Sequence, residues 1–145
     1  MSTVYKWWAG LMLVAVVVQI GLAGYGAFYT ADKVDGGVVD EDTFEDGFGP
    51  HMIFGSIILL LGLIFVIIGL AGGIGKWRLG RQGVLFLLLI LQMLLAGFGS
   101  EVPAIGFFHP VNALLILLLI LWIVNDTWRG GRMSASTASP PPAAV

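Results

Sequence analysis

Apolar residues fill four long stretches of this chain, and charged residues bound each stretch. The uncharged runs of 25, 29, 19 and 24 residues lie between Lys6 and Asp32, Asp46 and Lys76, Arg81 and Glu101, and Glu101 and Asp126. A helix needs about 20 mostly apolar residues to cross a bilayer. The pattern therefore predicts an all-α transmembrane four-helix bundle of up-down-up-down topology, with helices over residues 7–29, 50–74, 79–99 and 109–128.

The composition agrees with a membrane protein and leaves no room for a soluble domain. Hydrophobic residues make up 58% of the 145 residues and charged residues 11%, whereas an average globular protein has roughly 25% charged residues. We expect residues 1–132 to form the bundle, including an acidic outer loop over residues 30–49. Residues 133–145, rich in Ser, Ala and Pro, have the composition of a disordered cytoplasmic tail.

The basic residues predict how the helices are oriented. Six of the seven fall at the N-terminus, between the second and third helices, or after the fourth helix: Lys6, Lys76, Arg78, Arg81, Arg129 and Arg132. By the positive-inside rule, both termini are then cytoplasmic, in a multi-pass membrane protein. The lipid bilayer is the first expected partner, and nothing basic and clustered indicates nucleic acid.

The segment 30–49 carries seven of the nine acidic residues. It lacks the alternating ligands and turn glycine of a calcium-binding loop, so we interpret it as a solvated loop. The tetrapeptide Thr43–Asp46 matches a capping box that would start the second helix early, but this pattern is common by chance. The chain has no cysteine, which excludes disulfides, thiolate chemistry and cysteine-ligated iron–sulfur clusters.

Two segments resemble each other and predict an internal duplication. Residues 19–26 (QIGLAGYG) and 92–99 (QMLLAGFG) share the glutamine, a Leu-Ala-Gly triplet and the last glycine. An outer loop follows each segment, and the next helix opens with a histidine, His51 or His109. Two-helix units repeated in one orientation are related by a pseudo-twofold axis along the membrane normal.

This symmetry makes the second and fourth helices diagonal partners, so that the only two histidines face each other across the bundle. Ionisable residues inside membrane helices are functional candidates when they face the interior. Axial ligation of a b-type haem by His51 and His109 is the leading hypothesis, because bundle cores commonly hold such cofactors. The alternative for either histidine alone is an ordinary interfacial residue.

Several residues near the histidines are candidates for the same cofactor site. Gly24 and Gly97 lie at the expected depth of the histidines, and Gly55, Gly62 and Gly69 share one helical face with His51. Glycines there let the backbone approach a flat ring, although close helix packing explains the stripe equally well. Asn112 follows His109 by one turn and Ser56 follows His51, so either can hydrogen-bond to a ligand histidine or to a local carbonyl.

The sequence gives less support for a quinone contact, a zinc or copper site, or an enzyme. Gln19 and Gln92 are expected 10–15 Å deeper than the histidines, at about 1.5 Å per residue, as structural glue or as a quinone contact. Two histidines leave a tetrahedral zinc or copper site short of ligands, so Met52 or a loop carboxylate would have to join it. No carboxylate pair or Ser-His-Asp set can be placed in the bundle, which argues against an enzyme.

The Gln-x-x-Leu-Ala-Gly block, the histidine opening the second helix and the His-Pro-Val-Asn-Ala-Leu-Leu run resemble an uncharacterised family of small four-span bacterial membrane proteins. The arrangement is more distantly similar to one four-span half of haem A synthase. That resemblance implies that His51 and His109 flank a haem. The synthase has a glutamate closely before its first histidine and an arginine after it, whereas here Glu45 lies six residues upstream and Met52 follows.

The sequence thus favours a bis-histidine haem b protein that acts in electron transfer or haem handling, with a redox partner in the membrane. The competing hypothesis is a cofactor-free accessory or scaffold subunit of a larger membrane complex, or a homo-oligomer.

Overall fold

The computed structural model of the chain describes residues 3–34 and 37–136. Within them lie four long helices and a short one: α1 (Thr3–Lys33), α2 (Glu41–Ala71), α3 (Lys76–Glu101), α4 (Pro103–Gly106) and α5 (Phe108–Ser136). Four segments are long and apolar enough to cross a membrane. The predicted all-α helical bundle is confirmed, and the chain is a multi-pass membrane protein.

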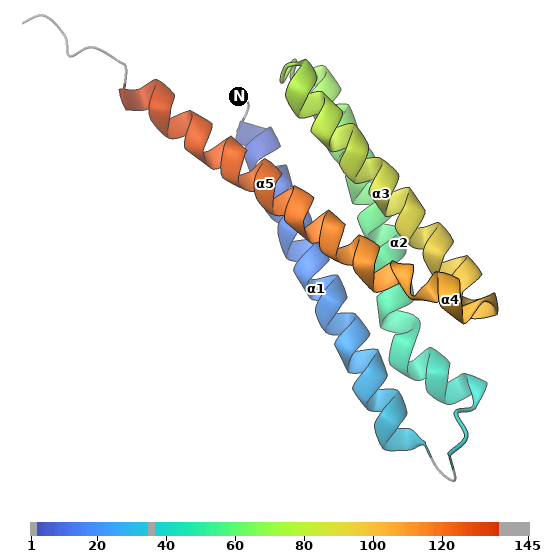
Figure 1. Cartoon of the computed structure of the whole chain (residues 1–145). Helices are drawn as coiled ribbons and strands as arrows, with labels where there is room; N and C mark the ends of the chain where they lie inside the picture. Colours follow the sequence, from blue (N-terminus) through green and yellow to red (C-terminus); the bar gives the residue numbers. More distant parts are fainter. Residues whose placement is uncertain (1–2, 35–36, 137–145) are drawn as a thin grey trace, which may run out of the picture.

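The long helices form a ring in the order α1, α2, α3, α5 (Figure 1). α1 packs against α2 and α5, and α3 packs against the same two helices. No Cα atoms of α1 and α3, or of α2 and α5, come within 8 Å of each other in the described ranges. The predicted diagonal relation between the helices is therefore confirmed.

The two ends of the bundle carry different segments of the chain (Figure 1). One end carries the start of α1, the α2–α3 turn and the C-terminal part of α5, and we call it the basic end. The opposite end carries the connection between α1 and α2, and we call it the acidic end. At the basic end, Asp126 accepts hydrogen bonds from Arg78 (3.0 Å) and Arg81 (2.8 Å), which ties α5 to α3.

Each long helix extends beyond its predicted bounds at one end or at both, although α2 ends at Ala71 instead of residue 74. α2 begins at Glu41 instead of residue 50, because Asp40 caps its first turn by accepting a 2.8 Å hydrogen bond from the Thr43 amide. Hydrogen bonds from Thr43 lower the pKa of Asp40 below its ordinary value, which keeps a negative charge at the positive end of the helix dipole. The acidic segment 30–49 is therefore mostly helical, and Pro50 lies inside α2.

The C-terminal boundary also differs. α5 continues to Ser136, so residues 133–136 are helical, although the sequence analysis assigns them to a disordered tail. The remainder of that predicted tail, residues 137–145, lies outside the described residues. No further prediction for the tail is tested.

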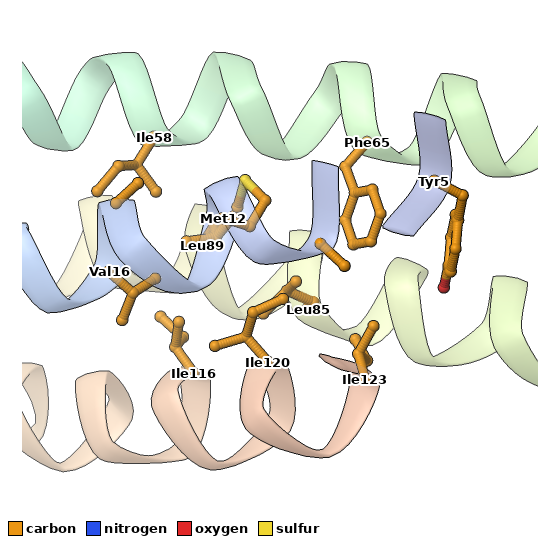
Figure 2. Close-up of a cluster of buried hydrophobic side chains, with 12 residues drawn as sticks. Tyr5, Met12, Val16, Ile58, Phe65, Leu85, Leu89, Ile116, Ile120 and Ile123 are labelled. Atoms are coloured by element: carbon orange, nitrogen blue, oxygen red, sulfur yellow. The ribbon is translucent and has the colours of Figure 1, made fainter. Parts of the chain in front are cut away.

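A hydrophobic core fills the half of the bundle nearer the basic end (Figure 2). α1 contributes Tyr5 and Met12, which lie seven residues and so about two turns apart on one face. α2 contributes Phe65, whose ring stacks on Tyr5 with centroids 5.2 Å apart. Leucines of α3 and isoleucines of α5 complete the core. Large apolar side chains also cover the outside of the bundle, as expected for a surface that faces lipid.

Candidate functional site

A cavity of about 630 Å³ replaces this core in the half of the bundle nearer the acidic end. All four long helices line it, mostly with apolar side chains. The polar side chains in its wall include Gln19, His51, Gln92 and His109. Such a volume is typical of a small-molecule or cofactor site.

The two histidines face each other across this cavity from diagonal helices. The ring centroids of His51 on α2 and His109 on α5 are 6.2 Å apart, with their planes at 64°. Both rings are partly buried. The prediction that the histidines meet across the bundle is therefore confirmed.

The same type of hydrogen bond holds both imidazoles. Nδ1 of His51 lies 3.1 Å from the backbone carbonyl of Gln19, and Nδ1 of His109 lies 3.2 Å from that of Gln92. A carbonyl can only accept, so Nδ1 must carry the proton. In the neutral ring, Nε2 then keeps its lone pair. Metal-ligating histidines commonly have this arrangement, in which a backbone carbonyl fixes the tautomer and the ring orientation.

The side chains of the two glutamines make different contacts. The Gln19 amide nitrogen donates to the backbone carbonyl of His51 (2.9 Å) and lies 3.3 Å from His51 Nε2. The Gln92 side-chain oxygen instead accepts a 2.7 Å hydrogen bond from Asn112, whose amide also donates to the Leu88 carbonyl (2.9 Å). Asn112 is only 4% exposed, so this second cluster is firmly packed.

These contacts correct the predicted depth of the glutamines. Gln19 and Gln92 lie level with the histidines, not 10–15 Å deeper, since each contacts the histidine directly. The prediction placed His51 in the first turn of its helix. The early start of α2 puts His51 ten residues inside it, and so nearer the level of Gln19.

The candidate glycines separate into two groups. Gly55 and Gly97 line the cavity, whereas Gly24 does not. A Cβ added at Gly55 would lie 2.9 Å from the Gln19 amide nitrogen, and one at Gly62 or Gly69 would meet side chains of α3. The glycine stripe of α2 therefore serves close helix packing, which was the alternative interpretation.

Two further candidates make local or indirect contacts. The Ser56 hydroxyl donates to the carbonyl of Met52, one turn earlier in its own helix. Asn112 does not line the cavity. Its side chain donates to the Gln92 side chain, and the backbone carbonyl of Gln92 in turn accepts from His109. Among the described residues, no three His, Asp or Glu side chains gather as a metal site would require.

Phe44 and Phe48 belong to the site, although the sequence analysis assigns them to the acidic loop. Their rings stack with centroids 4.9 Å apart, and the Phe48 ring lies 6.4 Å from that of His51. Both line the cavity. Positions 44, 48, 51 and 55 share one helical face, so this spacing could have placed Phe44 and Phe48 beside His51.

The exposed part of the cavity wall lies mainly on α2 and α3. Met52 is 47% exposed and Met93 is 38% exposed, and Ser56, Gly97 and Ser100 are exposed beside them. These helices are neighbours. The cavity therefore opens sideways, toward the surface that lipid covers.

Comparison with known proteins identifies the family of the chain. Residues 19–100, more than half of the sequence, match the model of a family of unknown function, DUF6220. The chain belongs to this family. The match includes Gln19, His51 and Gln92 and ends before His109 and Asn112. No curated protein and no solved structure matches the chain significantly.

Proposed function

We propose that this family member binds one b-type haem between His51 and His109 and serves in electron transfer or haem handling. The observation that carries the proposal is the facing pair of imidazoles, each held through Nδ1 by a backbone carbonyl. This arrangement leaves Nε2 of each ring unprotonated and therefore able to bind a metal.

The geometry fits a metal bound by two imidazoles. Two imidazoles would share one metal ion only if their ring centres lay within about 6–7 Å of each other, because each Nε2–metal bond would be about 2 Å long. The observed 6.2 Å separation agrees. Two protein ligands would suffice for a haem, and this suits a site in which the described His, Asp and Glu side chains form no group of three.

The chain's own residues would hold the haem and shield it. When bound, a haem supplies one-electron chemistry. The two imidazoles would bind its iron through Nε2, while Phe44 and Phe48 would cover the acidic end of the cavity. The hydrophobic core closes the cavity on the side of the basic end, so that water is excluded from that side.

The contacts of the two histidines also support the proposed duplication. Gln19 and Gln92, which occupy equivalent positions in the similar segments, use the same backbone atom to hold His51 and His109. A pseudo-twofold axis along the bundle would relate these two pairs. Haem A synthase, the more distant resemblance, has a comparable pair of ligands, but its hydroxylating chemistry is not part of this proposal.

The distribution of charge supports an orientation in a bacterial plasma membrane with both termini in the cytoplasm. Lys6, Lys76, Arg78 and Arg81 lie in the segments at the basic end of the bundle, whereas the acidic residues Asp32, Asp40, Glu41, Asp42 and Glu45 lie in the segments at the other end. Basic residues favour the cytoplasmic side. The acidic end, with the cavity, would then face outward.

A haem titration of the protein in detergent tests the proposal. The wild type is expected to bind one haem per chain and to show the sharp bands of six-coordinate low-spin haem. The double variant His51→Ala/His109→Ala is expected to lose both binding and bands. Gly24→Leu serves as the control, because a side chain at Gly24 meets open space away from the cavity. A wild type without saturable binding would favour a cofactor-free scaffold subunit instead.

A further inference from the structure

The two histidines are not equivalent, and the difference resides in the glutamine beside each. We propose that His109 is the permanent haem ligand, whereas His51 is an exchangeable one that gives way to a small exogenous ligand such as carbon monoxide or free imidazole. This inference rests on the proposed haem site and adds a second, open coordination position to it.

On α2, the Gln19 side chain competes for the nitrogen that would bind the iron. Its amide nitrogen lies 3.3 Å from His51 Nε2 and 2.9 Å from the His51 backbone carbonyl. With the proton of His51 on Nδ1, Nε2 can only accept, so the Gln19 amide donates to it. His51 must give up this hydrogen bond before it can ligate a metal.

On α5, the equivalent competitor is held away. The Gln92 side-chain oxygen accepts from Asn112 at 2.7 Å, and Asn112 is anchored to the Leu88 carbonyl at 2.9 Å. Among the described residues, no side chain hydrogen-bonds to Nε2 of His109. His109 therefore presents its lone pair to the cavity without competition.

This asymmetry gives His51 two stable partners. If the bond between a haem metal and Nε2 broke, an exogenous ligand would take the place of His51, and Nε2 would accept a hydrogen bond from the Gln19 amide. No electron or proton is transferred. The bond from His51 Nδ1 to the Gln19 carbonyl persists in both states, so the imidazole stays at the site and can rebind.

Carbon monoxide binding to the reduced haem protein tests the exchange. Gln19→Leu removes the competing amide but keeps the backbone carbonyl that holds Nδ1. His51 should then stay on the metal longer, and carbon monoxide association should slow about two- to tenfold, the equivalent of one hydrogen bond. Gly24→Leu, which adds a side chain away from the cavity, is the control and should bind carbon monoxide at the wild-type rate. Equal rates in Gln19→Leu and wild type, or equal slowing in both variants, would overturn the inference.

The single histidine variants provide a second readout. His51→Ala is expected to retain haem with a five-coordinate, high-spin spectrum, whereas His109→Ala should lose most of it. Equal losses, or the reverse order, would contradict unequal ligands while the haem site itself stands. A wild type that binds no haem would remove both the proposed function and this inference.

Discussion

Small residues determine how closely α1 and α2 approach. Gly24 and Gly26 are only two residues apart in α1, yet they have different surroundings. A Cβ at Gly26 would lie 2.9 Å from the backbone oxygen of Gly47, whereas one at Gly24 would meet nothing within 4 Å. Backbone atoms cannot move aside as a flexible side chain can, so the two helices would have to separate at Gly26.

We therefore predict opposite effects of alanine at these two positions. Gly26→Ala should lower the free energy of unfolding by about 1–3 kcal/mol through overpacking. Gly24→Ala should be neutral or should raise it by up to about 1 kcal/mol, because alanine favours a helix over glycine. Thermal unfolding in one detergent, followed by circular dichroism, measures both. Equal effects of the two variants would show that the α1–α2 contact is looser than described.

At the scale of helices, the basic end is joined by polar contacts between α3 and α5. Asp126 accepts from two guanidinium groups, and the Arg81 guanidinium also lies 4.8 Å from the Trp122 ring centre. The side chains of Arg81 and Asp126 are 18% and 34% exposed. Such partly buried, hydrogen-bonded pairs contribute more than exposed ones.

Asp126→Ala should consequently destabilise the bundle by about 1–2 kcal/mol, because two arginines lose their acceptor. Asp32→Ala is the control, since its pair with Lys33 is 3.7 Å long and well exposed. We expect no measurable change there. The melting temperatures in detergent compare them. A melting temperature for Asp126→Ala equal to that of the control would mean that the α3–α5 pairing adds no stability.

The sequence predicted which helices exist better than where they begin and end. The long uncharged runs follow directly from the thickness of a bilayer, so all four helices could be found. The first turns of α2 were missed because acidic residues in a first turn resemble a solvated loop, although Asp40 and Glu41 stabilise a helix start. That error also misplaced Gln19 relative to His51, since relative depth depends on where each helix begins.

For the whole molecule, the ring order of the helices made the site predictable in outline. The diagonal relation of the second and fourth helices, with one histidine on each, was sufficient to predict that His51 and His109 meet. The hydrogen bonds of the glutamine side chains were not predictable, because Gln19 and Gln92 look equivalent in sequence and differ only in their packed neighbours. The tautomer of each histidine was not predictable either, because it depends on the backbone carbonyl that lies beside Nδ1 in the folded chain.

The proposed orientation of the molecule can be measured with single cysteines, since the chain has none of its own. Val38→Cys at the acidic end should react with a membrane-impermeant maleimide added to intact bacterial cells. Lys76→Cys at the basic end should react only after the cells are permeabilised. The opposite pattern of labelling would reverse the orientation and place the cavity near the cytoplasmic face.

The most direct test of the central claim is a dithionite-reduced minus oxidised absorption spectrum of the purified protein. Protein produced with ample haem supply is compared with His51→Ala/His109→Ala prepared in the same way. The haem assignment predicts a shifted Soret band and a sharp α band in the wild type, and neither band in the double variant. A colourless wild type that also stays colourless after haem addition, or equal bands in both proteins, would contradict it.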